Sequence, residues 1–181
     1  IFDFIKSLKI HEPDELDLEE AKQKALAIFP LSGYPPDFTL TMSHARRVAI
    51  NKRRNLETRP DDAVFVRIAK RKCPGDNQPQ NMWVWPGLLM VGQGHKVLKG
   101  TFLTVKSCDK ETIVLSDDTV LTHEQAAASL RLANALTYAS SQGLTLKGRV
   151  RLEISSPHFT IKHLYVGASR ATSSTLLECV E

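Results

Sequence analysis

One arginine, Arg170, has the setting that an anion-binding side chain needs. It follows an apolar run from Leu164 to Ala168 and the small polar residue Ser169, and a second run of strand type extends from Thr175 to Val180. The guanidinium is thereby held near the end of an apolar segment, and its donor fork can bind two phosphate oxygens together. We predict a phosphate-binding arginine; the alternative is a surface arginine that closes an apolar segment.

A second stretch upstream places a small-residue turn between two strand-like runs, 135–138 and 150–154. Its Ser141-Gln142-Gly143-Leu144-Thr145 resembles motif V ("HKSQGLT") of the C-terminal motor domain of superfamily 1 helicases, closest to the RecD-like branch. Tyr165-Val166-Gly167-Ala168-Ser169-Arg170-Ala171 resembles motif VI ("YVALSRA") of the same family. Two motifs in the right order and separation make the resemblance specific. Ala139-Ser140 stands where the family has His-Lys, which removes one basic contact to the nucleic-acid backbone.

The resemblance implies an α/β fold. We expect a RecA-like, mainly parallel sheet flanked by helices, with an inserted small β-barrel. Residues 1–60 and 131–181 would form the second RecA-like helicase domain, and residues 61–130 the barrel subdomain.

The family's motifs also imply site residues in this chain. Arg170 would be the catalytic arginine finger on the γ-phosphate of ATP, and Gln142 and Gly143 would complete the ATP-binding set. The strand 38–42 and the helix 45–55 fit the position of motif IV. The nucleic-acid-binding residues would be Ser43, His44, Arg46, Arg47, Thr137, Ser140 and Ser141. For His44 taken alone, a surface or capping histidine is the alternative.

Two motifs of a complete motor are absent from the sequence. There is no P-loop, since Gly143 to Gly148 has the glycine spacing but Arg149-Val150 follows where Lys-Ser/Thr is required. No Asp-Glu pair follows an apolar strand to hold magnesium. We expect ATP and Mg²⁺ to be bound mainly by an N-terminal RecA-like domain of the same polypeptide, so residues 1–181 should be inactive alone. The start at Ile1 fits a fragment, although trimming would give the same start.

The basic residues of the chain are unevenly placed. The net charge is +4, and residues 44–72 hold ten basic residues against three acidic ones. Such asymmetry favours a polyanionic partner, although a solvated helix face has the same composition. The resemblance to superfamily 1 helicases implies that this partner is single-stranded nucleic acid, and DNA in particular. Two alternatives stay open: the C-terminal domain of a viral-type RNA helicase, and a non-catalytic nucleic-acid-binding module.

Residues 61–130 differ from the rest of the chain in their pattern of short apolar runs and turns. Short strand-like runs at 64–68, 83–91, 101–105, 112–115 and 119–121 are separated by turns, with a polar loop at 73–80, which favours a small barrel. Trp83 and Trp85 would stack on the bases of a single strand or would fill the barrel core. A short helix or loop over 123–130 leads back to the main domain.

The cysteines and the hydropathy of the chain indicate the kind of cellular compartment to expect. Cys73, Cys108 and Cys179 are far apart and show no metal-binding spacing, so we expect a reducing, intracellular setting and no metal site. Nucleus, cytoplasm and association with a virus are equally compatible with this. No apolar run approaches the roughly 20 residues of a membrane span, so we expect no membrane partner.

Overall fold

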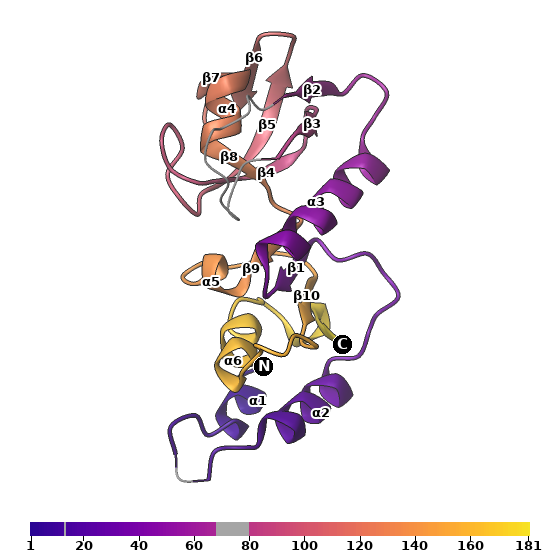
Figure 1. The fold of residues 1–181 in the computed structure, drawn as a ribbon, viewed down its shortest axis with the longest axis vertical. Coiled ribbons are helices and arrows are strands. Elements are labelled where there is room, and N and C mark those ends of the chain that lie inside the picture. The colour runs from indigo at the N-terminus through magenta and orange to yellow at the C-terminus, as the bar shows by residue number, and fades with distance from the viewer. Residues whose placement is uncertain (13, 68–79) are drawn as a thin grey trace. The chain divides into compact units, whose positions relative to one another are not determined.

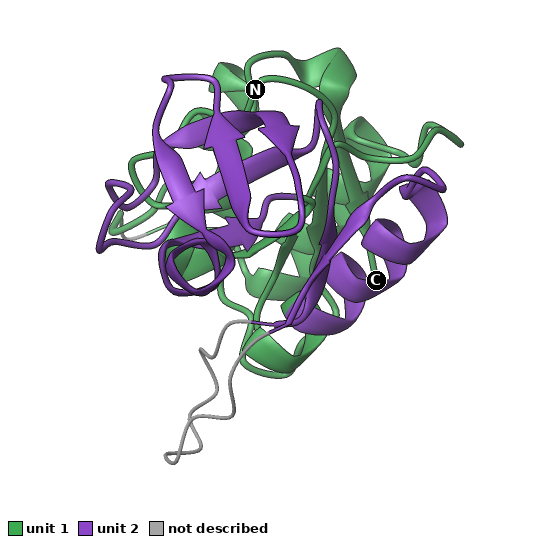
Figure 2. Ribbon diagram, turned by 90° about the horizontal axis from the view of Figure 1, so that it is seen from above, with its two compact units in different colours: residues 1–47, 134–181 green, residues 48–133 purple. Residues whose placement is uncertain are grey.

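The computed structural model describes residues 1–12, 14–67 and 80–181. The chain divides into two compact units, shown in Figure 2: unit 1 comprises residues 1–47 and 134–181, and unit 2 comprises residues 48–133. The expected boundaries were at 60/61 and 130/131, whereas the first division falls within the helix α3 (His44–Thr58). Lys70, Arg71, Lys72, Cys73 and residues 74–79 of the expected polar loop lie outside the described residues.

Unit 1 is built on a four-stranded parallel sheet with the strand order β11-β10-β1-β9 (Figure 1). The strands are β1 (Phe38–Thr41), β9 (Ala135–Thr137), β10 (Val150–Glu153) and β11 (Leu177–Val180). Every residue of β1 and β9 is buried, as expected for strands of a parallel sheet covered on both faces. Because the strands are parallel, their carboxyl ends meet at one edge of the sheet.

The helices of unit 1 are α1 (Phe2–Ser7), α2 (Leu18–Ile28), α5 (Tyr138–Ser141) and α6 (Ile161–Ala168). Asp17 caps α2 by accepting from the Glu19 amide at 2.9 Å, and Glu19 and Glu20 place negative charge in the first turn. The helix α2 contacts β11 and α6 contacts β10. At the second contact Gly167 lets the helix backbone approach the buried Leu152, since a Cβ there would lie 2.8 Å from Leu152 Cδ2.

Unit 2 contains a five-stranded antiparallel sheet, with the order β7-β6-β5-β4-β8, that curls into a half-barrel. A β-bulge between Val105 and Ser107 interrupts one ladder. A separate antiparallel pair, β2-β3, completes the unit. The bounds are β2 (Val64–Val66), β3 (Met82–Val84), β4 (Leu89–Gly92), β5 (Phe102–Cys108), β6 (Thr112–Leu115), β7 (Val120–Thr122) and β8 (Leu130–Leu132).

The helix α4 (His123–Ser129) begins with a capping box between Thr122 and Gln125, and leads directly into β8. The core of unit 2 gathers apolar side chains from both sheets and from α4, including the fully buried Met90, Ile113 and Ala126. The predicted class is confirmed: a parallel α/β sheet is joined to an antiparallel half-barrel inserted between β1 and β9.

The run before Arg170 is helical, which corrects the expectation of a strand-type segment at 164–168. The helix α6 starts one turn earlier, at Ile161, where Thr160 and His163 form a capping box. Thr175 and Leu176 likewise belong to a short 3₁₀ helix, Ser174–Leu176, before β11. The sequence pattern did not predict α1 or β8, which are short and lack a repeating apolar period.

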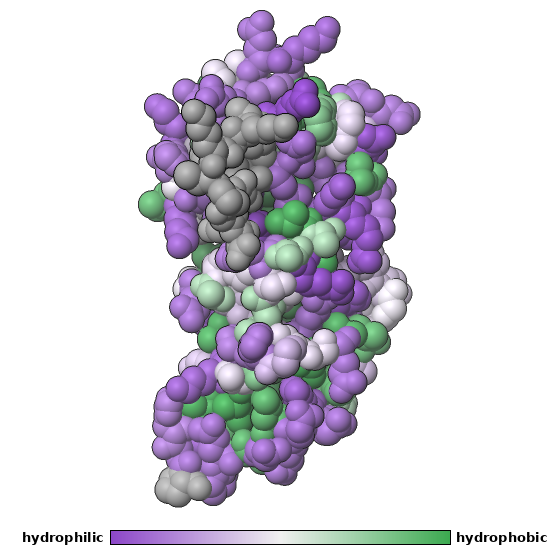
Figure 3. Space-filling model, viewed as in Figure 1, coloured by the Kyte–Doolittle hydropathy of each residue, from purple (hydrophilic) through white to green (hydrophobic). Residues whose placement is uncertain are grey.

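Apolar surface gathers on one face of unit 1, around α1 and α6 (Figure 3). Among the large apolar side chains of these helices, Phe2 is 67% exposed and Tyr165 is 44% exposed. A contiguous apolar patch of this kind is a candidate for contact with another domain. None of the helices in the described part of the chain has the length and apolar character needed to cross a membrane.

Candidate functional site

Arg170 follows α6 directly and is held by hydrogen bonds on two sides. Its Nε donates to the Val166 carbonyl at 3.2 Å, and its Nη2 donates to Ser169 Oγ at 2.9 Å. On the other side, Nη1 donates to the carbonyl of Leu144 at 3.2 Å. The side chain is half-buried. A guanidinium has five N–H donors, so these contacts fix the plane of the group and leave Nη hydrogens for an anion.

The two motif-like segments are joined through their backbones as well. The Leu146 amide donates to the Arg170 carbonyl at 2.9 Å, and Leu146 and Ala171 form a parallel bridge. Gln142 and Gly143 form an exposed turn immediately before this junction, and Gly143 has a φ of +79°, a conformation that favours glycine. The three predicted ATP-binding residues therefore lie in two segments that backbone hydrogen bonds join to each other.

The carboxyl ends of β1 and β9 bring a second group of predicted residues together. Thr41 and Thr137 are register partners at the ends of these neighbouring strands. Ser43 is exposed and its Oγ accepts from the Arg46 amide at 3.1 Å, so it caps the start of α3. The predicted Ser43 and Thr137 thus lie at the same edge of the sheet, next to a helix N-terminus that can accept an anion.

A hollow of about 170 Å³ lies at this edge, at the ends of β1 and β10. It is lined by hydroxyl, charged and small side chains: Thr41, Met42, Ser43, Arg46, Glu153, Ser155 and Ser156. Sequence reasoning found Ser43 and Arg46 but missed the serine pair, whose signal was its position immediately after a strand-like run. Hydroxyls and an arginine suit a phosphate group.

Arg46 is paired with a carboxylate inside this hollow. Its Nε lies 3.0 Å from both oxygens of Glu153, and its Nη2 lies 2.5 Å from Glu153 Oε1. The pairing raises the pKa of the Arg46 guanidinium. The Arg46 side chain is 56% exposed, and exposed ion pairs contribute on the order of 1 kcal/mol or less. The Glu153 side chain is only 17% exposed, so a phosphate that took its place on Arg46 would leave a largely buried carboxylate without this partner.

Three of the predicted nucleic-acid residues have buried side chains. Ser141 is fully buried and donates to the Tyr138 carbonyl at 2.9 Å, so its hydroxyl serves the fold. Thr137 forms the capping box of α5 with Ser140, which is half-buried. In this structure the side chains that face solvent are those of Ser43 and Arg46, and in part those of His44 and Ser140.

The third buried residue, Arg47, is only 4% exposed and differs from the others in its hydrogen bonding. Its Nε and Nη2 have no hydrogen-bond partner among the described residues, and burial lowers the pKa of the guanidinium. Nδ1 of the half-buried His44 is likewise unpaired within the described part of the chain. An unpaired buried charge is costly. Arg47 is therefore a candidate for an anionic partner that the described residues do not supply.

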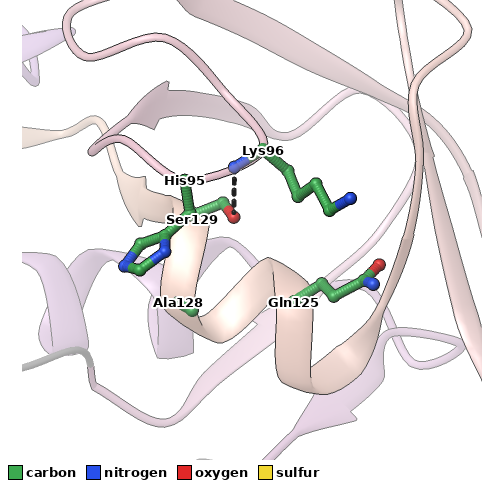
Figure 4. Close-up of a pocket in the computed structure, with 5 residues that line it drawn as sticks. All are labelled: His95, Lys96, Gln125, Ala128 and Ser129. Atoms are coloured by element: carbon green, nitrogen blue, oxygen red, sulfur yellow. Dashed lines mark hydrogen bonds between the residues drawn. The ribbon is translucent and has the colours of Figure 1, made fainter.

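Unit 2 contains a larger hollow of about 350 Å³, drawn in Figure 4. His95, Lys96, Gln125, Ala128 and Ser129 line it, and the Lys96 amide donates to Ser129 Oγ at 3.3 Å. In Figure 4 the side chains of His95 and Lys96 diverge to either side of Ser129. None of the predicted site residues lines this hollow. Within residues 1–12, 14–67 and 80–181, no group of three or more metal-ligating side chains is placed to hold a metal ion.

The parallel sheet, its flanking helices and the curled antiparallel half-barrel together match the fold of a RecA-like helicase domain. No protein-family model matches the chain, and no curated protein matches it in sequence.

Three solved helicase structures have this fold over almost the whole chain. The Pif1 helicase from Candida albicans superimposes with a TM-score of 0.65 at 17% identity, covering 99% of this chain and 52% of that one. A Pif1 helicase studied for unwinding of forked double-stranded DNA gives 0.65 at 18% identity, covering 98% and 46%. Bacteroides Pif1 bound to single-stranded DNA gives 0.62 at 17% identity, covering 99% and 49%. The chain thus spans about half the length of the structures it matches.

Proposed function

We propose that this chain is the C-terminal part of an ATP-dependent DNA helicase of superfamily 1, in the RecD-like branch. The observation that carries the proposal is the junction between the two motif-like segments, where Arg170 donates to Leu144 and accepts from Leu146. The shared fold with Pif1 helicases supports the same assignment. Unit 1 would be the second RecA-like domain, and unit 2 its inserted barrel.

In this proposal the N-terminal RecA-like domain of the same polypeptide binds most of the nucleotide. ATP, when bound with Mg²⁺, would supply the γ-phosphoryl group, whose transfer develops negative charge in the transition state. Arg170 would hold that developing charge with the Nη hydrogens left over from its backbone contacts. The contacts to Leu144 and Ser169 would keep the guanidinium in one orientation, so little reorganisation is needed at the moment of reaction.

The edge formed by the ends of β1 and β9 would be part of the single-strand track. Ser43 and Arg46 offer a hydroxyl and a guanidinium at the surface, and the buried Arg47 offers Nε and Nη2, which have no hydrogen-bond partner among the described residues. Such contacts bind the phosphate backbone and carry no sequence preference. Bacteroides Pif1 was solved with single-stranded DNA, which favours DNA over RNA as the substrate here.

The test is ATP turnover in the complete polypeptide. Arg170→Ala should reduce DNA-stimulated turnover by roughly 10³-fold, the lower end of the arginine-finger effect, with little change in affinity for single-stranded DNA. Arg170→Lys should recover little, because it keeps the charge and loses the fork. The matched control is Lys162→Ala, which removes an exposed cation from α6.

Near-normal turnover in a folded Arg170→Ala variant would return Arg170 to a surface arginine and refute the proposal. A complete polypeptide that binds nucleic acid and has no ATP turnover would instead identify a non-catalytic binding module. Turnover stimulated by single-stranded RNA and not by DNA would identify the RNA helicase alternative.

A further inference from the structure

Two aromatic side chains face outward from the small sheet of unit 2. Phe65 and Trp83 are register partners on β2 and β3, and their ring centroids lie 4.9 Å apart at an interplanar angle of 49°. Phe65 is 44% exposed and Trp83 is half-buried. The other side of the same strands is the barrel core, where Val66, Met82 and Val84 are buried. The aromatic pair is therefore on the solvent side of a sheet whose inner face is already filled.

A guanidinium extends this pair into a stack of three planar groups. The Arg59 Cζ lies 4.3 Å from the centre of the Trp83 ring, and the Arg59 side chain is exposed. An arginine over an indole is attracted by the ring quadrupole. The stack Arg59–Trp83–Phe65 thus presents both an aromatic edge and a cationic plane to solvent.

The stack is held in place from beneath. Asn55 is 3% exposed, and its Nδ2 donates to the Trp83 carbonyl at 2.8 Å while its Oδ1 accepts from the Trp83 amide at 2.8 Å. A carboxamide that satisfies both backbone groups of one residue fixes that residue to the helix α3. Trp83, the middle member of the stack, is consequently pre-positioned, and a base that stacks on an outer member needs to order little of the protein.

The surrounding charges favour an anionic partner. Over residues 52–67 the described chain has five basic residues and three acidic ones: Lys52, Arg53, Arg54, Arg59 and Arg67 against Glu57, Asp61 and Asp62. Planar aromatic and guanidinium groups beside a net positive charge are the combination that binds unpaired bases of a single strand. A proline-rich peptide also binds aromatic grooves, but the positive charge gives it no added attraction.

We propose that Phe65, Trp83 and Arg59 form a stacking platform for an unpaired base of single-stranded nucleic acid. This inference rests on the proposed function, since it assigns the barrel unit a share of the strand that the motor moves. The platform reads no sequence, because every base has a π-face. It would add affinity that does not depend on the phosphate contacts at the sheet edge of unit 1.

The test measures the affinity of the whole chain for oligothymidine by fluorescence anisotropy, and compares it with an abasic oligonucleotide of the same length and charge. Phe65→Leu keeps the apolar volume and removes the ring, while Arg59→Lys keeps the charge and removes the plane. Each should weaken oligothymidine binding by about 5- to 100-fold, the effect of one stacked base. Neither should change binding to the abasic oligonucleotide, and the salt slope should stay constant because no charge is lost.

The matched control is Val120→Ala, an exposed apolar side chain on β7 of the same unit. Unchanged oligothymidine affinity in a folded Phe65→Leu variant would overturn the platform, as would an equal loss on the abasic oligonucleotide. Binding of a proline-rich peptide that depends on Phe65 and excludes oligothymidine would also overturn it. Because Arg170 turnover is measured separately, a platform that fails while Arg170→Ala still abolishes turnover leaves the proposed motor intact.

Discussion

Replacing Gly167 with alanine sets two effects of opposite sign against each other. Alanine is favoured over glycine inside a helix by about 1 kcal/mol. The new Cβ, however, would lie 2.8 Å from Tyr138 Cε1 and 2.8 and 3.0 Å from the two Cδ atoms of Leu152. Ordinary carbon contacts are about 3.5–4.0 Å, so both neighbouring side chains, Tyr138 and Leu152, must move.

Neither neighbour has room to move. Leu152 is fully buried and Tyr138 is 2% exposed, with its hydroxyl bonded to the Glu153 carbonyl at 3.2 Å. Overpacking of a filled core costs about 1–3 kcal/mol, and the larger part of that range applies because the ring cannot rotate away. After subtracting the helix gain we expect Gly167→Ala to lower the free energy of unfolding of unit 1 by about 1–2 kcal/mol.

The assay is urea unfolding followed by far-ultraviolet circular dichroism. Tryptophan fluorescence serves as an internal control, since Trp83 and Trp85 both lie in unit 2 and should be unaffected. In a Leu152→Ala background two of the three close contacts disappear, so the same glycine replacement should become neutral or stabilising. A Gly167→Ala variant that is more stable than the parent would show that the gain in helix propensity exceeds the cost of overpacking. That result would refute the tight contact between α6 and β10.

Three further changes have defined outcomes. Asn55→Ala should lower the stability of unit 2 by about 2–4 kcal/mol in a fluorescence-monitored urea titration, because two backbone groups of Trp83 lose their partner; a loss no larger than that of the exposed control Lys52→Ala would contradict the clamp. Ser169→Ala should reduce ATP turnover of the complete polypeptide roughly tenfold, and Ser169→Thr should restore it, because the hydroxyl orients Arg170; equal turnover in both variants would exclude that role. Burial lowers the pKa of His163 from its ordinary value of 6.5, so the unfolded state binds more protons than the folded state near that pH. The free energy of unfolding should therefore decrease as the pH falls below 6.5. A His163→Gln variant with the same pH dependence between about 7.5 and 5.5 would rule out this role of His163.

The sequence predicted those features that depend on local pattern. The strand at 38–42 and the helix at 45–55 depend on short-range signals, and β1 and α3 formed where they were expected. The parallel sheet was implied by the resemblance of two segments to helicase motifs, and the barrel by the close spacing of short strand-like runs. The pattern around 164–168 failed, because a short apolar run has no period that separates a buried helix from a buried strand.

The candidate site residues were predicted as residue types and not as pairings. Nothing local relates Arg46 to Glu153, which are 107 positions apart, or Arg170 to the carbonyl of Leu144. The burial of Arg47 and Ser141 is equally a property of the packed domain. Long-range contacts decide which side chains are available to a ligand, so a motif names the candidates and the fold selects among them.

The place of the barrel in the chain has a consequence for how the protein is made. The strand β1 is interior to its sheet, and both of its neighbours, β9 and β10, are translated only after the whole of unit 2. At about 5–20 residues per second, β1 waits on the order of 5–20 s on the ribosome before either partner exists. Unit 2 is continuous in sequence and can fold during that wait, whereas β1 is an unpaired apolar strand throughout it. A nascent chain stalled before Asn134 would therefore carry a folded barrel and an exposed, aggregation-prone segment at 38–41. We expect chaperones to bind this segment during synthesis.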